Sequence, residues 1–231
     1  KLTPDDIYHL SILAIMEYLT SGITANADMY LTPDTMIQAS EDCGFRTTVI
    51  GAVNDFTQSV KEVENWYEKY HKEDGLTSYE LGFHAEYTTK REILEGISEL
   101  SKKYHAPIYT HNSESASEVA QCVERTGMTP TVYMEQLGLF EYGGGLYHCV
   151  HMSEEDLDVV KRHQISVITN PASNLKLASG IAPIEEMLKR NIDLAIGTDG
   201  PASNNCLDMF REMFLVTALA KYRENDASAV D

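Results

Sequence analysis

The feature that most constrains the fold of this chain is a regular alternation of short apolar segments with amphipathic helical ones. The apolar segments lie at 23–29, 47–53, 78–83, 107–110, 146–150, 165–169 and 192–197. The helical ones lie at 4–20, 34–42, 57–71, 90–104, 115–126, 130–138, 153–163, 183–190 and 206–222. Strands that alternate with helices are typical of a parallel sheet, because parallel neighbours need a crossover connection. The sequence therefore predicts an α/β fold with seven parallel strands.

Two parallel architectures compete for this pattern. A (β/α)₈ TIM barrel needs eight strands, one more than the pattern supplies. A doubly wound open sheet would carry a Gly-rich phosphate loop after its first strand, and no GxGxxG occurs there. The glycines 143–145 precede a strand and open no helix, so they do not form such a loop. No linker divides the chain, which we interpret as one barrel domain over residues 1–231.

Charge and cysteine usage limit the class of partner. The 231 residues hold 18 Lys and Arg against 36 Asp and Glu, a net charge of −18. This balance argues against nucleic-acid binding, which needs cations for the phosphates. No apolar run is long enough to span a membrane. The four cysteines are scattered, which favours free thiols and a cytoplasmic location.

Ionisable side chains follow four of the seven predicted strands. Each stands where a strand ends, and the carboxyl ends of barrel strands form the active face of such folds. Imidazole and carboxylate together suit a zinc or iron site. The residues concerned are His84, His111 with Glu114 three positions later, His148 followed by His151, and Asp199.

The residues alone leave two roles open. Asp199 could bind a metal, or it could cap its own loop by accepting backbone hydrogen bonds. Glu114 could shuttle a proton, or it could be the acidic residue that favours the start of the following helix. The remaining histidines lie on predicted helices, where we expect them to be solvated: His9, His71, His105 and His163.

Four motifs, in order along the chain, resemble the amidohydrolase superfamily: THNSES, YHCVHMSEEDL, NPASNLKLASGIAPI and GTDGPASNN. More narrowly, they are similar to the 5′-methylthioadenosine/S-adenosylhomocysteine deaminases. The opening LTPDDIYHLSILAIMEYLTSGITANADMY also fits, so the resemblance covers nearly the whole chain. It implies a (β/α)₈ barrel, usually with a small β-sandwich formed by both chain ends. It also implies one divalent metal, zinc foremost and iron or manganese otherwise.

The resemblance implies a role for each strand-end residue but one. His111 and Asp199 would be metal ligands, and Glu114 would shuttle a proton to the substrate, which it would also contact. His148 would polarise the attacking water with Asp199, and His84 would contact the substrate. His151 matches no family role, and we interpret it as structural.

The implied activity is hydrolytic deamination of an adenine-type nucleoside, with release of ammonia. Candidate substrates are 5′-methylthioadenosine, S-adenosylhomocysteine and adenosine. Assembly of the protein into a homo-oligomer is left open. Hydrolysis of guanine or a triazine is the alternative within the superfamily. A non-catalytic barrel remnant is the alternative outside it.

The sequence departs from the family pattern at its metal site. The superfamily holds its metal partly through an HxH at the end of the first strand, and no HxH occurs here. The seven strands would correspond to barrel strands two to eight, without the first strand and the sandwich segments. We therefore expect little activity from this chain in isolation. Thr169 stands where relatives often carry His, which leaves the substrate open.

Overall fold

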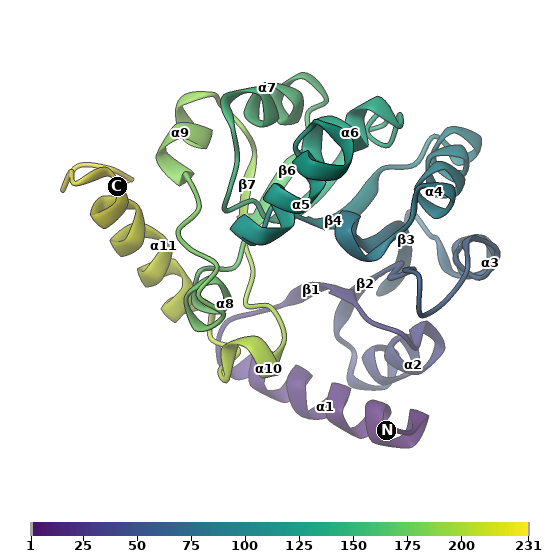
Figure 1. Ribbon diagram of the computed structural model, residues 1–231. Helices are drawn as coiled ribbons and strands as arrows, with labels where there is room; N and C mark the ends of the chain where they lie inside the picture. The colour runs from purple at the N-terminus through teal and green to yellow at the C-terminus, as the bar shows by residue number, and fades with distance from the viewer. Residues whose placement is uncertain (1, 231) are drawn as a thin grey trace.

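The computed structural model describes residues 2–230, which form one parallel sheet of seven strands in sequence order. The strands are β1 (Ala25–Met29), β2 (Arg46–Ile50), β3 (Thr77–Ala85), β4 (Ile108–Asn112), β5 (Gly144–His148), β6 (Ser166–Thr169) and β7 (Leu194–Ile196). Every neighbouring pair is parallel. The sheet curls into an incomplete barrel with the helices around its outer side (Figure 1). The predicted barrel fold is confirmed.

Helices supply the crossovers, and their ends follow from local sequence. They are α1 (Pro4–Thr20), α2 (Pro33–Cys43), α3 (Val60–Tyr70), α4 (Arg91–Tyr104), α5 (Ala116–Thr126), α6 (Pro130–Gln136), α7 (Glu154–Arg162), α8 (Pro171–Lys176), α9 (Ile184–Lys189), α10 (Pro201–Asn204) and α11 (Met209–Glu224), with a 3₁₀ turn η1 (Glu86–Thr88). Capping boxes start three of them, at Thr3, Ser115 and Ser153. Such boxes satisfy backbone N–H groups that a helix start leaves unpaired.

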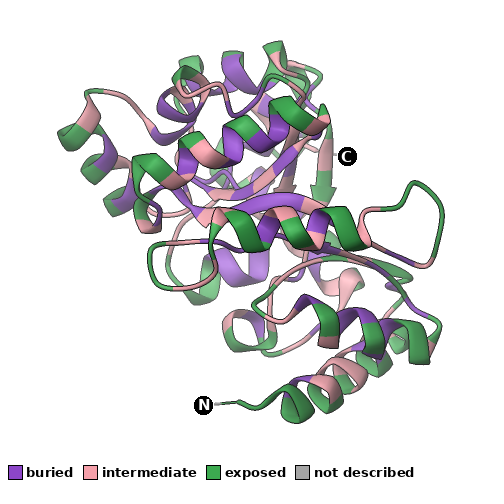
Figure 2. Cartoon of the chain, turned by 90° about the vertical axis from the view of Figure 1, so that its right-hand side faces the viewer, coloured by how far each residue is buried: buried purple, intermediate pink, exposed green. Residues whose placement is uncertain are grey.

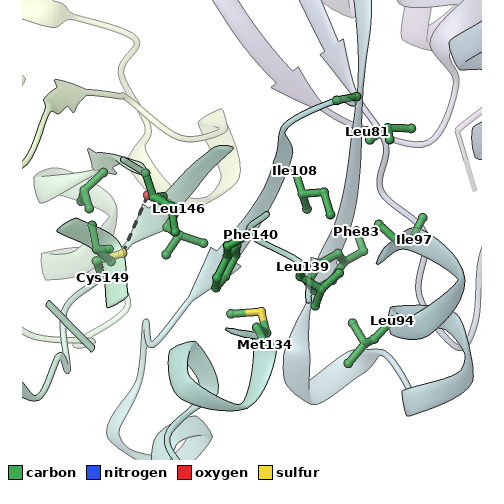
Figure 3. Close-up of a cluster of buried hydrophobic side chains, with 14 of the residues drawn as sticks. Leu81, Phe83, Leu94, Ile97, Ile108, Met134, Leu139, Phe140, Leu146 and Cys149 are labelled. Carbon is green, nitrogen blue, oxygen red and sulfur yellow. Dashed lines mark hydrogen bonds between the residues drawn. The ribbon is translucent and has the colours of Figure 1, made fainter. Parts of the chain in front are cut away.

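The core lies between the middle strands and the helices α4 and α6 (Figure 3). Four side chains of the middle strands point into this core and are fully buried, namely Leu81, Phe83, Ile108 and Leu146. They pack in one cluster with side chains from the two helices and the loop after α6, namely Leu94, Ile97, Met134, Leu139 and Phe140. Burying a side chain of this size contributes about 1.5–3 kcal/mol. The middle strands are therefore anchored by a cluster of fully buried side chains on one face of the sheet.

Five strands end at residues other than predicted on the side that carries the site, and β3 and β5 are two of them. Strand β3 runs on to Ala85, so His84 lies inside the strand rather than after it. Strand β5 starts at Gly144 and stops at His148, because His148 and Cys149 have φ of 70° and 50° and cannot continue it. A Cβ on Gly144 would lie 1.9 Å from the Ile108 carbonyl oxygen, so close strand packing explains this glycine.

The prediction of a buried last strand was wrong. Strand β7 has three residues, with Ala195 exposed and Leu194 and Ile196 half-buried, because β7 is an edge of the sheet. The segments after β6 and β7, where no helix was predicted before residues 183 and 206, contain the short helices α8 and α10. Both helices begin at a proline, whose fixed φ suits the first helical position.

The edges β1 and β7 are not paired with each other in the described part of the chain. The end of α1 still contacts the segment before α11, because the Leu207 backbone N–H donates to the Glu17 carboxylate at 2.8 Å. Figure 2 shows mostly exposed and half-buried residues on the N-terminal helix, where only Ile7 and Ile15 are buried. No helix in residues 2–230 is both long and apolar enough to cross a membrane. All four cysteines are free, as predicted.

Candidate active site

Three histidines gather at the carboxyl ends of the middle strands. His84 comes from β3, His111 from β4 and His148 from β5. The His84 and His111 ring centroids lie 5.0 Å apart, and those of His111 and His148 lie 5.5 Å apart in a stacked arrangement. The curl of the sheet thus brings together three of the residues that the sequence singled out.

His111 is held in the tautomer that a metal ligand needs. Its Nδ1 lies 2.7 Å from the His84 carbonyl oxygen, which can only accept, so Nδ1 carries the proton. Nε2 then has a free lone pair in the neutral ring. Burial, with His148 and His84 nearby, lowers the pKa of His111 to about 3. The ring therefore stays neutral at physiological pH.

His148 lies between the two carboxylates of the site. Its Nδ1 donates to the Asn174 side-chain oxygen at 2.7 Å. Its Nε2 lies 3.7 Å from a Glu114 oxygen and 4.0 Å from an Asp199 oxygen. The residue is almost fully buried, with 1% of its surface exposed. Nε2 thus faces both carboxylates, at distances longer than a direct hydrogen bond.

Asp199 makes the loop-capping contact and still presents an oxygen to the site. Its Oδ1 accepts the Gly200 backbone N–H at 2.6 Å, which is the loop-capping contact. Its Oδ2 accepts from the Ser173 hydroxyl at 2.6 Å and is the oxygen nearest to His148. Burial acts to raise the pKa of Asp199, but the hydrogen bonds from Ser173, Gly200 and Ser203 bring it below its ordinary value. Asp199 is therefore an ionised carboxylate aimed at the site.

Glu114 is not used to start the helix that follows it. Ser115 is the N-cap of α5, and Glu118 completes the capping box. Glu118 also accepts the backbone N–H groups of Ser113 and Glu114, at 2.9 and 2.8 Å. The Glu114 carboxylate is left to face His148 through Oε2 and the Ser179 hydroxyl, 3.3 Å away, through Oε1.

His84 also points a free nitrogen outward. The Thr88 hydroxyl donates to the Ala85 carbonyl at 3.1 Å and therefore accepts from His84 Nδ1 at 2.8 Å. The Nε2 atom of the neutral ring then carries a lone pair. Burial lowers the pKa of His84, although Glu114 acts in the opposite direction. This half-buried ring can accept a hydrogen bond from a ligand.

The supporting role of the segment 170–179 was not predicted from the sequence. Within it, Ser173 contacts Asp199, Asn174 contacts His148 and Ser179 contacts Glu114. The only sequence signal was the run of Asn and Ser residues in NPASN, whose members lie on one turn of α8. Their partners are 26 to 65 residues away, so the pattern could not name them.

A buried carboxylate on α11 ties this segment to the Asp199 loop. Glu212 is completely buried and accepts the Ala172 backbone N–H at 3.0 Å. It also accepts from the Asn204 side chain at 2.9 Å, and Asn204 in turn donates to the Thr198 carbonyl at 2.6 Å. Thr198 directly precedes Asp199. Glu212 therefore links the two segments that position the edge carboxylate.

The other histidines divide into two groups. His9 and His105 are exposed, as expected. His71 and His163 are half-buried and paired, so the expectation of solvated residues was wrong for them. His71 stacks on Tyr67 with centroids 4.4 Å apart and lies 3.2 Å from Glu80, and His163 lies 2.8 Å from Glu135.

Two of the side chains present could supply part of a metal site. The free Nε2 of His111 and the ionised Asp199 are suitable ligands. Across residues 2–230, however, no three or more His, Cys, Asp or Glu side chains are placed together so that they could hold a metal ion. A catalytic zinc needs at least three protein ligands, so a zinc bound by these two residues would need further ligands.

Comparison with known proteins identifies the family. The model of the amidohydrolase family matches residues 2–230, and the chain belongs to this family. The family is metal-dependent, and the predicted resemblance is confirmed.

Individual relatives narrow the comparison. The chain is 38% identical over 239 residues to a 5-methylthioadenosine/S-adenosylhomocysteine deaminase of Caldanaerobacter subterraneus, covering 100% of this chain and 55% of the relative. It is 36% identical to a 5′-deoxyadenosine deaminase of Methanococcus maripaludis, covering 92% and 52%. The chain thus spans about half the length of these curated relatives.

Solved structures agree in fold. An adenosine deaminase from Xanthomonas campestris with bound zinc has a TM-score of 0.94 and 32% identity, covering 100% of this chain and 54% of that one. A guanine deaminase from C. acetobutylicum reaches a TM-score of 0.88 at 20% identity, over 99% of this chain and 59% of that one, which supports the fold alone.

Proposed function

We propose that the protein containing this chain is a metal-dependent aminohydrolase that deaminates an adenine-type nucleoside. The observation that carries the proposal is the placement of two carboxylates, Glu114 and Asp199, at 3.7 and 4.0 Å from the same nitrogen of His148. Water-dependent deamination needs a base for the water and an acid for the ring. The names of the relatives, as deaminases of adenine nucleosides, support the choice of substrate.

His111 and Asp199 would hold the metal, with zinc first and iron or manganese as alternatives. Strands β1 to β7 would take the places of barrel strands two to eight, so that other ligands come from outside the described residues. A bound divalent ion activates water at neutral pH and stabilises developing negative charge. The neutral His111 ring and the ionised Asp199 are in the protonation states that such binding requires.

The chain's own residues would move the protons. His148 Nε2, facing both carboxylates, would take a proton from the attacking water and share it with Asp199. Glu114 would deliver a proton to a ring nitrogen of the purine, and His84 would accept a hydrogen bond from the substrate. After water adds at the amino-bearing carbon, the proton held by His148 and Asp199 would pass to the departing amino group, which leaves as ammonia. The hydroxyl proton of the addition product would return to Glu114 as the carbonyl forms.

We also propose a small-molecule substrate and a cytoplasmic location. The net charge of −18 is unfavourable for nucleic acid, and the four unpaired cysteines suit a reducing compartment.

Two other functions are kept because an observation favours each. Hydrolysis of guanine or a triazine stays the alternative within the family, because a guanine deaminase and an atrazine chlorohydrolase share this fold. A non-catalytic barrel is suggested by the incomplete metal site among residues 2–230.

Ammonia release tests the proposal. The protein containing residues 1–231, with any sequence that flanks them, would be loaded with zinc and given 5′-methylthioadenosine, S-adenosylhomocysteine, adenosine, guanine and atrazine separately. We expect turnover of at least one adenine nucleoside. Turnover of guanine alone, or dechlorination of atrazine alone, would transfer the assignment to the sister activity. No turnover of any compound by a zinc-loaded protein would favour the non-catalytic alternative.

A further inference from the structure

His151 is the strand-end histidine to which neither the sequence nor the proposed chemistry gives a role. It follows β5 by three residues, and its ring is half-buried. Its Nε2 lies 2.7 Å from the Ser179 carbonyl oxygen. Because a carbonyl can only accept, Nε2 carries a proton and donates it in this contact.

Ser179 connects this imidazole to the site. While its carbonyl accepts from His151, its hydroxyl donates to Glu114 Oε1 at 3.3 Å. The Ser179 backbone N–H is also used, donating to the Asn174 carbonyl at 2.8 Å. Both ends of the residue are therefore held while its side chain reaches the proposed proton shuttle.

The backbone around Ser179 needs such support. Ala178 has φ of 57°, in the left-handed region, where a residue with a Cβ is disfavoured. Gly180 has φ of 128°, and a Cβ there would lie 2.9 Å from Val150 and 3.7 Å from the His151 ring. The loop is thus packed against His151 in a conformation that the imidazole hydrogen bond stabilises.

His151 also holds Glu114 from the other side. Its backbone N–H donates at 2.9 Å to the carbonyl of Ser113, the residue directly before Glu114. Ser113 itself has φ of 48°. One residue therefore contacts the backbone that precedes Glu114 and, through Ser179, the carboxylate of Glu114.

We propose that His151 is a positioning residue for Glu114, acting through Ser179. With Oε1 engaged by the Ser179 hydroxyl, the carboxylate leaves Oε2 turned toward His148 and the reacting centre. The inference deepens the proposed function and rests on Glu114 being its proton shuttle. It concerns orientation of the carboxylate and requires no change in charge of His151.

Matched variants test the contact in the zinc-loaded protein. His151→Leu removes the donor, whereas His151→Gln places an amide N–H near the position of Nε2. Ser179→Ala removes the hydroxyl, whereas Ser179→Thr keeps it. We expect His151→Leu and Ser179→Ala each to lower kcat about fivefold with KM unchanged, and the conservative variants to retain most of kcat. The double variant should lose no more than the larger single loss, because both changes break one chain of contacts.

Structures of the same variants keep the test independent of turnover. In His151→Leu and Ser179→Ala we expect the Glu114 carboxylate to turn away from His148, and in His151→Gln to stay. Unchanged Glu114 positions would overturn the proposal even if the wild type proves inactive. Equal loss of kcat and melting temperature in His151→Gln and His151→Leu would also overturn it, since that result indicates general packing. A wild type without deaminase activity but with the expected Glu114 movement would reject the proposed function alone.

Discussion

The middle strands and the edge strands of this sheet differ in how they hold functional side chains. On β3, β4 and β5 the strands bury Leu81, Ile108 and Leu146 completely and carry three imidazoles at their carboxyl ends. Strand β7, which precedes Asp199, has three residues, and its last residue, Ile196, is only half-buried. At the other edge, helix α1 leaves Leu13 and Met16 about 60% exposed.

The difference shows where preorganisation comes from. The three histidines are positioned by strands whose side chains pack in the buried core. Asp199 depends on added contacts, from Ser173 on α8 and from Glu212 through Asn204 and the Thr198 carbonyl. We therefore expect changes in the middle to act through the core or directly on chemistry, and changes near the edge to act through these hydrogen bonds.

The largest effect should come from Glu114, which follows a middle strand. Glu114→Gln keeps the shape of the side chain and removes its acid–base function. We expect turnover to fall roughly 10²- to 10⁴-fold, with metal content unchanged. Metal analysis beside the ammonia assay checks both parts. Loss of metal together with activity would mean that Glu114 is a ligand.

Packing of the middle strands can be compared directly with the edge helix. Ile108→Ala should lower the free energy of unfolding by about 2–5 kcal/mol, because Ile108 is fully buried. The control Leu13→Ala, at a residue 60% exposed, should change it by less than about 0.5 kcal/mol. Denaturant titration measures both. A loss at Leu13 as large as that at Ile108 would mean that another surface covers α1.

The link from α11 to the Asp199 loop should have an intermediate effect. Glu212→Leu removes both acceptors and leaves the Ala172 N–H and the Asn204 amide without their partner. We expect a loss of about 1–3 kcal/mol in unfolding free energy and weaker retention of zinc. Glu212→Gln, which keeps one carbonyl acceptor, should lose less. If Glu212→Leu retains zinc as well as the wild type does, Asp199 does not depend on Glu212 for its position.

The edge strand β1 allows a pH test. Burial raises the pKa of Asp28 to about 6. Because the folded-state value lies above the unfolded one, stability from Asp28 is full below about pH 4 and is lost as pH rises through 6. Asp28→Asn removes this dependence. The advantage of Asp28→Asn over the wild type in unfolding free energy should be about 1–2 kcal/mol larger at pH 8 than at pH 4. This figure is reduced because the residue is only half-buried. If the unfolding free energies of the wild type and Asp28→Asn change with pH in the same way, Asp28 is not the source of the dependence.

The sequence predicted what depends on local pattern. Alternating apolar and amphipathic segments indicated the parallel sheet, and the strand-end positions of His84, His111, His148 and Asp199 follow from it. The half-buried edge strand β7 and the short helix α8 could not be predicted in the same way. Exposure of β7 depends on whether another strand pairs with its outer edge, which the local sequence does not indicate. The contacts of α8 join residues 26 positions apart in the sequence.

Metal removal tests the central claim most directly. The zinc-loaded protein would be assayed for ammonia release from the adenine nucleoside that it turns over best, treated with a chelator, and assayed again after zinc is restored. We expect turnover to stop on chelation and to return with zinc, while the chain stays folded throughout. Turnover that persists in the metal-free protein would contradict the assignment of His111 and Asp199 as metal ligands and, with it, the proposed mechanism.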